Sequence, residues 1–503
     1  MPATEYNVLI YALDVGQGSG QFIVVKKGAV IEKTMIIDLG SERKTMRRAG
    51  GPAVEFVVRQ LKTMERPRID ALIFSHSDAD HIDLVTGVLS QFSATELSIV
   101  FTRYGGDRAK YTYMTKADGK KRAKEKNLIK LVEAYMLPGQ LAATFHGNES
   151  DFNVTPVEPF LVFSGTGGED YLKLYLVNGN ATSVLPGGKK LRTDGDAFAI
   201  NTDSLVVMVD VGGVRFVATG DATGATMAQC NAALANAQVR ADYFTNVFAV
   251  TMPHHGAENT TLGIEKTGTL EGRRDDAAAF ANFRQFIAYI PPQTLLVSAD
   301  LNTSYKHPSA FLMKEYYPTL ATTRWYTDPA LTNNAHYYTA YFTKSDGYQV
   351  TNADGTVSHW PTTTTYNWWY SLQTDVNVFT TYYFNPTLQY KSDKALRLPP
   401  NPGTLVDPAT AKLPIGVAWI YGIAPDGTKT FARLENRAAS LAERRQIFAD
   451  ARAMWLEEPP DPRAAADRVG RADVEAARLA AVDLAPRPIA ARAPGFARLR
   501  RVR

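Results

Sequence analysis

The sequence predicts an α/β protein with its functional residues at a turn between a strand and a helix. Residues 71–74 form an apolar run typical of a buried strand, and apolar residues recur at helical spacing from residue 82 to residue 89. Between the two, residues 75–81 read SHSDADH, so two histidines and two aspartates fall within one short turn. Ligands bind at such turns in α/β folds because loop residues converge there while the sheet stays rigid.

Strands and a helix precede this turn. Three strands are expected, at residues 8–11, 21–25 and 34–37. The first two are joined by DVGQGSG at residues 14–20, where alternate glycines permit a tight turn and a close approach of the backbone. Residues 52–64 carry their apolar side chains on one stripe and predict an amphipathic helix that leads to the strand at 71–74.

Strands and helices continue to alternate after the turn. Further strands are expected at residues 97–101, 201–209, 214–218, 248–252 and 295–299. A helix is expected at residues 310–317. Residues 322–390 are rich in Trp, Tyr and Thr, which is typical of β-strands, and predict a β-rich extension, with a base-stacking platform as the alternative. From residue 433 Ala and Arg dominate and predict one or two helices followed by a disordered or partner-bound end.

The turn at residues 75–81 has the composition of a metal site. His76, Asp78, Asp80 and His81 are ligand types for Zn, Mn and Fe. Without a cation the two carboxylates would repel each other and their desolvation would be costly. A divalent ion removes both costs, so we interpret the turn as a metal site rather than as a solvated acidic turn with surface histidines.

Five further motifs follow the order of a known family. The spacing His-x-Asp-x-Asp-His resembles the His-x-His-x-Asp-His motif of the metallo-β-lactamase superfamily, with Asp78 where a second histidine is usual. This variant resembles the hydrolase domain of the DNA-uptake protein ComEC and its soluble relatives. The family's other motifs are matched in order by LDVGQG at 13–18, IIDLG at 36–40, TGD at 219–221, PHHG at 253–256 and YKHPS at 305–309. Lys306 in the last motif stands where the family usually has glycine.

The resemblance implies an αββα sandwich that holds one or two divalent metal ions, Zn or Mn, at one edge. The ligands that it implies are His76, Asp78, Asp80, His81, Asp221 and either His255 or His254. We expect only one of the two adjacent histidines to ligate, because neighbouring residues on an extended chain point in opposite directions. The resemblance also implies that Asp38 is not a ligand itself but holds metal-binding side chains in place. Asn201 stands near the place where the superfamily commonly has a histidine. This departure would leave one of the two metal positions, the first, with few ligands.

The implied activity is that of a metal-dependent hydrolase acting on phosphodiester bonds in nucleic acid or nucleotides. Asp80 would orient the attacking water, and His307 or Lys306 would protonate the leaving group or stabilise its charge. Residues 103–130 are strongly basic and would bind the substrate through Lys120, Lys121 and Arg122, unless this segment is a solvated lysine-rich helix. The alternatives are hydrolysis of a lactone, lactam or thioester, and a metal-binding interaction module in a bacterial defence or signalling system.

Composition and organisation limit these possibilities. The net charge of +4 is small, so affinity for nucleic acid must come from local patches. Cys230 is the sole cysteine, which excludes an internal disulfide and fits a reducing compartment. The N-terminus has no signal-peptide pattern, and no apolar run approaches the roughly 20 residues of a membrane span, so we expect a cytoplasmic protein without membrane insertion.

Three parts are expected along the chain. They are a metallo-β-lactamase-like hydrolase domain at 1–330, a β-rich aromatic extension at 331–432 and a short Ala/Arg-rich helical to disordered tail at 433–503. The end of the tail, residues 487–503, contains six arginines and no acidic residue, and would suit an acidic partner.

Overall fold

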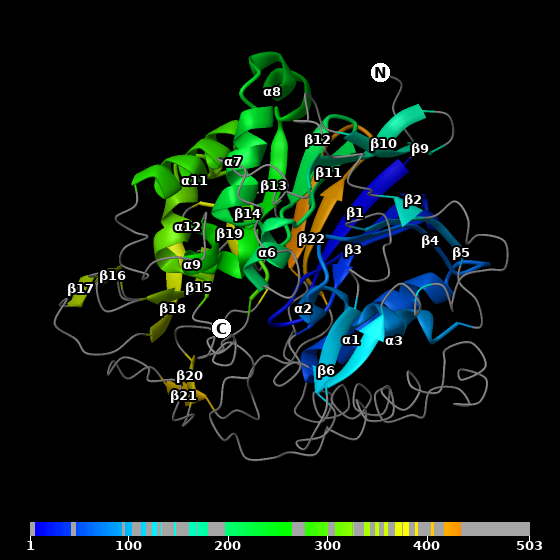
Figure 1. Cartoon of the computed structure of the whole chain (residues 1–503), viewed down its shortest axis with the longest axis horizontal. Helices are drawn as coiled ribbons and strands as arrows, with labels where there is room; N and C mark the ends of the chain where they lie inside the picture. Colours follow the sequence, from blue (N-terminus) through cyan, green and yellow to red (C-terminus); the bar gives the residue numbers. More distant parts are fainter. Residues whose placement is uncertain are drawn as a thin grey trace, which may run out of the picture.

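Two β-sheets packed face to face form the centre of the protein, whose computed structural model is drawn in Figure 1. The structure describes residues 6–41, 47–92, 96–102, 112–116, 123–127, 132, 145–146, 160–166, 169–179, 197–263, 277–299, 307–323, 325, 336–342, 348–351, 357–360, 368–374, 376–381, 388–390, 404–406 and 417–433.

The first sheet contains the N-terminal strands. In spatial order its strands are β23 (Lys429–Arg433), β22 (Val417–Ile423), β1 (Tyr6–Leu13), β2 (Gly20–Lys27), β3 (Val30–Leu39), β4 (Arg68–Phe74), β5 (Glu96–Thr102) and β8 (Phe145–His146). The strands from β23 to β3 are antiparallel to their neighbours, whereas β3, β4, β5 and β8 run parallel. The His/Asp turn follows β4, so it lies at the C-terminal edge of the parallel strands.

The second sheet is built from the middle of the chain. In spatial order its strands are β19 (Val378–Thr380), β14 (Thr294–Val297), β13 (Val247–Thr251), β12 (Val214–Ala218), β11 (Val206–Val211), β10 (Glu169–Asn178) and β9 (Phe160–Thr166). The strands β12, β13, β14 and β19 run parallel, so the motifs that follow β12 and β13 emerge side by side.

Apolar cores on both faces of each sheet explain the sequence pattern. Ile73 of β4 and Phe216 of β12 belong to the core between the two sheets. Leu72 and Phe74 of β4 point to the outer side of the first sheet and belong to a separate core there. A parallel strand that is covered on both faces reads as a continuous apolar run, which is why residues 71–74 do not alternate in polarity.

Helices cover the two outer faces (Figure 1). The first sheet packs against α1 (Arg47–Lys62) and α3 (Val85–Leu89), and the second against α7 (Gly224–Ala233), α8 (Ala237–Tyr243), α11 (Ala277–Tyr289) and α12 (Ala310–Tyr316). The short helices α2 (Ala79–Ile82), α6 (Ala197–Thr202), η3 (Pro253–Gly256) and α9 (Glu258–Thr261) lie in connections. This order of layers confirms the αββα sandwich that the sequence predicts.

The sandwich includes strands that lie beyond residue 330. β19 forms an edge of the second sheet, and the hairpin β22–β23 pairs with β1 of the first. Trp419 of this hairpin stacks on Phe431 with ring centroids 5.0 Å apart, and its indole nitrogen donates to the carbonyl oxygen of Thr380 in β19 at 2.9 Å. The expected domain boundary at residue 330 therefore does not coincide with the edge of the sandwich.

The other described strands pair outside the two main sheets. They are β15 (His336–Phe342) with β18 (Trp368–Thr374), β16 (Tyr348–Thr351) with β17 (Val357–Trp360), β20 (Leu388–Tyr390) with β21 (Thr404–Val406), and β6 (Thr112–Lys116) with β7 (Ala123–Asn127). The β6–β7 pair lies in the basic segment and is extended, not the lysine-rich helix of the alternative interpretation. The tail from residue 434 lies outside the described residues. In the described part of the chain, no helix has both the length and the apolar character needed to cross a bilayer.

Candidate metal centre

The His/Asp turn after β4 is held against two glycine-containing loops. The backbone nitrogen of Ser19 donates to the carbonyl oxygen of Asp80 at 2.9 Å. A Cβ atom at Gly40 would collide with the backbone nitrogen of His81, and one at Gly18 would lie 2.7 Å from the carbonyl oxygen of Asp80. The glycines of the DVGQG and IDLG motifs thus let these loops approach the turn closely and fix its place on the sheet edge.

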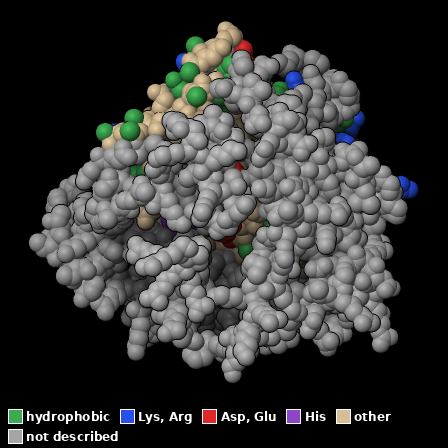
Figure 2. Space-filling model, viewed as in Figure 1, with side chains coloured by type: hydrophobic (Ala, Val, Ile, Leu, Met, Phe, Trp, Pro, Cys, Tyr) green, Lys and Arg blue, Asp and Glu red, His purple; other side chains and the backbone are tan. Residues whose placement is uncertain are grey.

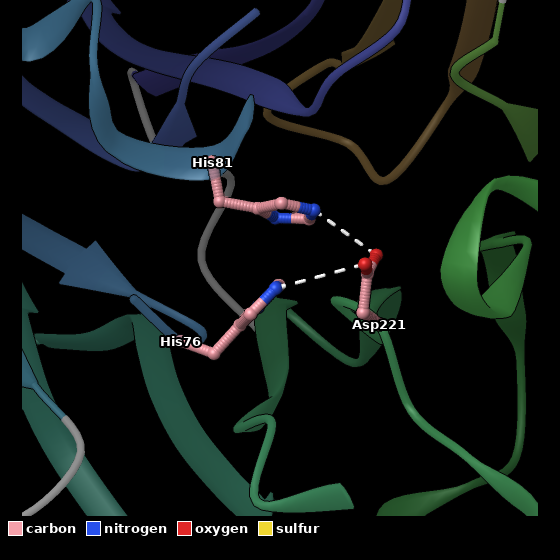
Figure 3. Close-up of side chains that lie close together, drawn as sticks. All are labelled: His76, His81 and Asp221. Atoms are coloured by element: carbon pink, nitrogen blue, oxygen red, sulfur yellow. Dashed lines mark ion pairs between the residues drawn. The ribbon is translucent and has the colours of Figure 1, made fainter. Parts of the chain in front are cut away.

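Asp221 is the centre of the cluster. It follows β12, while His254 and His255 follow the neighbouring parallel strand β13, so the second sheet delivers all three to the edge where β4 of the first sheet ends. Figure 3 shows His76 and His81 on one side with their rings directed at the Asp221 carboxylate. Figure 2 shows histidine and acidic side-chain atoms between the atoms drawn in grey on this face.

One oxygen of Asp221 is shared by two histidines that also approach Asp80. Nε2 of His81 lies 3.0 Å and Nε2 of His255 lies 3.4 Å from Oδ1 of Asp221. The two Nε2 atoms are 3.3 Å apart, and Nε2 of His255 is 3.6 Å from Oδ2 of Asp80. These four side chains surround one small volume.

The other oxygen of Asp221 faces a second pair of histidines. Nε2 of His76 lies 3.6 Å and Nε2 of His254 lies 3.5 Å from Oδ2 of Asp221. Nε2 of His76 is also 3.9 Å from Oδ2 of Asp78. The structure therefore brings together every ligand candidate from the turn, Asp221 and both residues of the His-His pair.

Acceptors behind the rings fix which nitrogen faces the cluster. Nδ1 of His81 lies 2.8 Å from Oδ2 of Asp38, and Nδ1 of His255 lies 2.7 Å from the carbonyl oxygen of Ser298. Both partners only accept, so each Nδ1 carries a proton, and Nε2 is the ring nitrogen that faces the cluster and can bind a metal ion when it gives up its own proton. Asp38 in turn accepts hydrogen bonds from the backbone nitrogen and hydroxyl of Ser75 at 2.7 and 2.6 Å, in the supporting position that the resemblance implies.

The buried charges stabilise one another. Burial lowers the pKa of His81, but the carboxylates of Asp221 and Asp38 outweigh this effect and hold that pKa well above its ordinary value. Burial raises the pKa of Asp80, but a hydrogen bond from His255 and the charge of His81 outweigh it and lower that pKa to about 2. Burial is also outweighed at Asp221, whose pKa the neighbouring histidines hold well below its ordinary value. Both carboxylates are thus ionised at neutral pH, as ligands must be.

The donor set fits a divalent transition metal. The Nε2 atoms of His81 and His255 converge with carboxylate oxygens, and such a group needs a cation or protons between its members. The buried Oδ1 of Asp221 accepts no hydrogen bond from the described residues. Two triplets have ligand atoms close enough to hold one ion, His76 with His81 and Asp221, and Asp80 with His81 and His255. Imidazole and carboxylate together suit Zn and Mn.

The expectation that only one histidine of the His-His pair ligates a metal assumed that the two rings point in opposite directions, and the structure instead brings both rings to Asp221. That expectation took the chain to be extended, but φ is 45° at His254 and 54° at His255, so both residues adopt the left-handed conformation. Their rings are nearly perpendicular to each other, at 88°, and each approaches a different oxygen of Asp221. A left-handed pair of non-glycine residues has no clear sequence signal, apart from the glycine at 256 that continues the turn.

Two other expected residues border the cluster. His307 is buried with its ring stacked on that of His255, at 5.9 Å between centroids and 15° between planes. Asn201 is also buried, and its Nδ2 lies 3.3 Å from Nδ1 of His254. Lys306, Lys120, Lys121 and Arg122 lie outside the described residues.

Sequence reasoning missed several residues that support the rings. Gln17 contacts His307, Ser298 supports His255, and the hydroxyls of Ser75 and Ser204 lie 3.0 and 3.3 Å from Nδ1 of His76. Gln17 lies within the LDVGQG motif, so its position in that motif was a usable signal. The serines had none beyond their proximity to ligand motifs in the chain.

Comparisons with known proteins add a likeness in fold. No protein-family model matches the sequence, and neither does any curated protein. The chain is similar to the metallo-β-lactamase fold protein YhfI from Bacillus subtilis, at 12% identity over 63% of this chain and 93% of that chain, with a TM-score of 0.29. It is also similar to Zn²⁺-bound PqqB from Methylobacterium extorquens, at 13% identity over 49% and 72% of the chains and a TM-score of 0.25. A third similar structure is the metallo-β-lactamase MIM-1 from Novosphingobium pentaromativorans, at 12% identity over 56% and 89% and a TM-score of 0.24.

The layers and the cluster at the strand ends define an αββα protein with a candidate centre for a divalent metal.

Proposed function

We propose that this protein is a metal-dependent hydrolase. The observation that carries the proposal is the convergence of four imidazole rings on the two oxygens of Asp221, with Asp78 and Asp80 beside them. These residues would hold a divalent ion, which would supply a water activated at neutral pH and would polarise the bond to be cleaved.

Three residues have distinct roles in this proposal. The side chains of Asp78 and Asp80 are 33% and 26% exposed, whereas that of Asp221 is 3% exposed, so the carboxylates of the turn can accept a hydrogen bond from the attacking water. Of these two we assign the orienting role to Asp80, which lies beside Nε2 of His255. His307 stacks beside the cluster on His255, and we assign to it the proton that the leaving group takes up. Lys306 adjoins His307 in the chain and would stabilise the charge of the leaving group.

We infer that the scissile bond is a phosphodiester in nucleic acid or a nucleotide. Two features support this substrate class, namely the resemblance of the motifs to the ComEC hydrolase domain and the basic character of residues 103–130. Lysines and arginines bind phosphates with release of counterions, which favours such substrates. Lactones, lactams and thioesters call for the same metal chemistry, and a metal-binding interaction module would bind the ion without turnover.

One experiment separates these functions. Protein stripped of metal and reconstituted with Zn²⁺ or Mn²⁺ is assayed on bis(p-nitrophenyl) phosphate, single- and double-stranded oligonucleotides, a lactone, a lactam and a thioester. We expect metal-dependent cleavage of the phosphodiesters and its loss in Asp221→Ala. Cleavage of the lactone, lactam or thioester without cleavage of any phosphodiester would change the substrate class. Metal binding without turnover of any substrate would refute the enzymatic proposal.

A further inference from the structure

The backbone at the His-His pair has an unusual conformation that directs both rings to one side. His254 has φ 45° and ψ 49°, His255 has φ 54° and ψ 14°, and Gly256 continues with φ 80°. Side-chain-bearing residues rarely adopt this region, and two in succession are costly unless the surroundings hold them. The turn is held, because the backbone nitrogen of His254 donates to the carbonyl oxygen of Gly220 at 3.1 Å and Ser309 donates to Gly256 at 2.9 Å.

The rings of His254 and His255 approach different oxygens of Asp221. His255 lies with His81 on the Oδ1 side, and His254 lies with His76 on the Oδ2 side. The aspartates of the turn divide in the same way, with Asp80 near His255 and Asp78 near His76. Each ligand-bearing segment of the chain therefore contributes to both halves of the cluster.

The distances from Oδ2 of Asp221 to the His254 and His76 rings are close to those between ligand atoms that share an ion. Bonds of 2.0–2.1 Å in a tetrahedral zinc site place neighbouring ligand atoms roughly 3.3–3.5 Å apart. His254 and His76 approach Oδ2 of Asp221 at 3.5 and 3.6 Å, close to this separation and longer than a good hydrogen bond.

Asn201 is suited to orient the His254 ring. Its side-chain amide lies 3.3 Å from Nδ1 of His254. The two ends of an amide are nearly indistinguishable in shape, so the oxygen can face the ring instead of the nitrogen. In that orientation Oδ1 of Asn201 accepts the Nδ1 proton of His254, and Nε2 is the nitrogen that faces Asp221, as Asp38 and Ser298 achieve for the other two rings.

We propose that the adjacent histidines serve different metal positions, with His254 completing a first position with His76, Asp78 and Oδ2 of Asp221, and His255 completing a second with Asp80, His81 and Oδ1 of Asp221. This inference rests on the proposed metal-dependent function. It assigns a further ligand to the first metal position, which would otherwise have few ligands because Asn201 stands near the place of the usual histidine. It makes Asn201 a positioning residue for His254.

Metal stoichiometry tests the division without using activity. His254→Gly and His255→Gly each remove one ring and retain the left-handed backbone, because glycine adopts positive φ freely. Elemental analysis after reconstitution should give two equivalents for the unaltered protein and one for each variant. With Co²⁺, the two variants should show different visible spectra, since different positions remain filled. Added imidazole should restore the second equivalent in His254→Gly by replacing the missing ring.

The matched control is Asn246→Gly. Asn246 has φ 55°, like the histidines, but precedes β13 whereas the pair follows it, and its side chain contacts Gly213 and Lys429. This variant should keep two equivalents. If His254→Gly also keeps two, the division is refuted while the hydrolase proposal stands, and a single equivalent in the unaltered protein refutes the division as well. Absence of metal from the unaltered protein refutes both proposals.

Discussion

The side chains of Gln17 and His307 form a buried pair that links two loops far apart in the chain. Nε2 of the Gln17 amide lies 2.6 Å from Nε2 of His307, although 290 positions separate them in the chain. Gln17 is 1% exposed and His307 is 3% exposed, so water does not compete for this contact. The pair connects the first glycine loop of the chain with the ring that we assign to leaving-group protonation.

We expect Gln17→Ala to lower kcat by about 10- to 100-fold, in the range seen when a partner behind a functional histidine is removed. The number of bound metal equivalents should stay unchanged, because Gln17 contacts His307 and not the cluster around Asp221. The control is Gln21→Ala, which removes a glutamine that is equally buried but contacts Ser19. Measurement of kcat and metal content in both variants tests this prediction. A loss of metal in Gln17→Ala would contradict the role of Gln17 in positioning His307.

Asp80→Ala should abolish turnover in a protein that remains folded. The substitution removes a carboxylate that lies near Nε2 of His255 and is exposed enough to meet the attacking water. Turnover, metal content and the thermal unfolding midpoint would be compared with those of Asp426→Ala, which alters an exposed turn between β22 and β23. Unchanged turnover in Asp80→Ala would show that the chemistry takes place elsewhere.

Gly40→Ala should weaken metal binding although residue 40 offers no ligand. The added methyl group would meet the backbone of Asp80, His81 and Ile82, and the ligand turn would have to move. Gly87→Ala in α3 is the matched control, because its methyl group would meet only Val54 side-chain atoms at 3.5 Å. The control should be neutral or stabilising by about 0.5–1 kcal/mol, since alanine favours helix over glycine. Titration with Zn²⁺ and thermal unfolding distinguish the two, and equal metal affinities would contradict the role of Gly40.

Cys230 should not react with thiol reagents in the folded protein. Burial raises the pKa of its thiol to about 12, so at pH 8 the reactive thiolate is a very small fraction. Labelling with iodoacetamide should therefore become measurable only under conditions that unfold the second sheet and α7, where Cys230 packs. Rapid labelling at neutral pH without denaturant would contradict the described packing.

Reversal of charge at Lys120, Lys121 and Arg122 should raise KM and reduce the salt dependence of binding, with kcat nearly unchanged. Contacts that are equal in the ground state and the transition state affect KM alone. The measurement is a steady-state profile on an oligonucleotide at several salt concentrations. If KM and the salt slope both stay constant, the basic segment between β5 and β8 has no part in binding the substrate.

The sequence predicts the parts of this protein that depend on local pattern. The continuous apolar run before His76 indicates a strand covered on both faces, and the spacing of His76, Asp78, Asp80 and His81 indicates a ligand turn. The contact between Gln17 and His307 could not be predicted this way, because it forms only after two distant loops meet. The direction of the His254 ring was also beyond prediction, since it depends on a backbone conformation that tertiary contacts impose.

The pairing of β1 with β22 has a consequence for biosynthesis. Val8 is paired with Ile423, so β1 is synthesised long before β22, the strand that hydrogen-bonds its second edge. During that interval the free edge of β1 exposes unpaired N–H and C=O groups to other nascent chains. A protease that cuts between residues 330 and 417 would leave the ligand motifs intact but would break the chain before the hairpin β22–β23, which covers the edge of β1. Loss of that hairpin would leave a fragment that has every candidate metal ligand and a free sheet edge prone to aggregation.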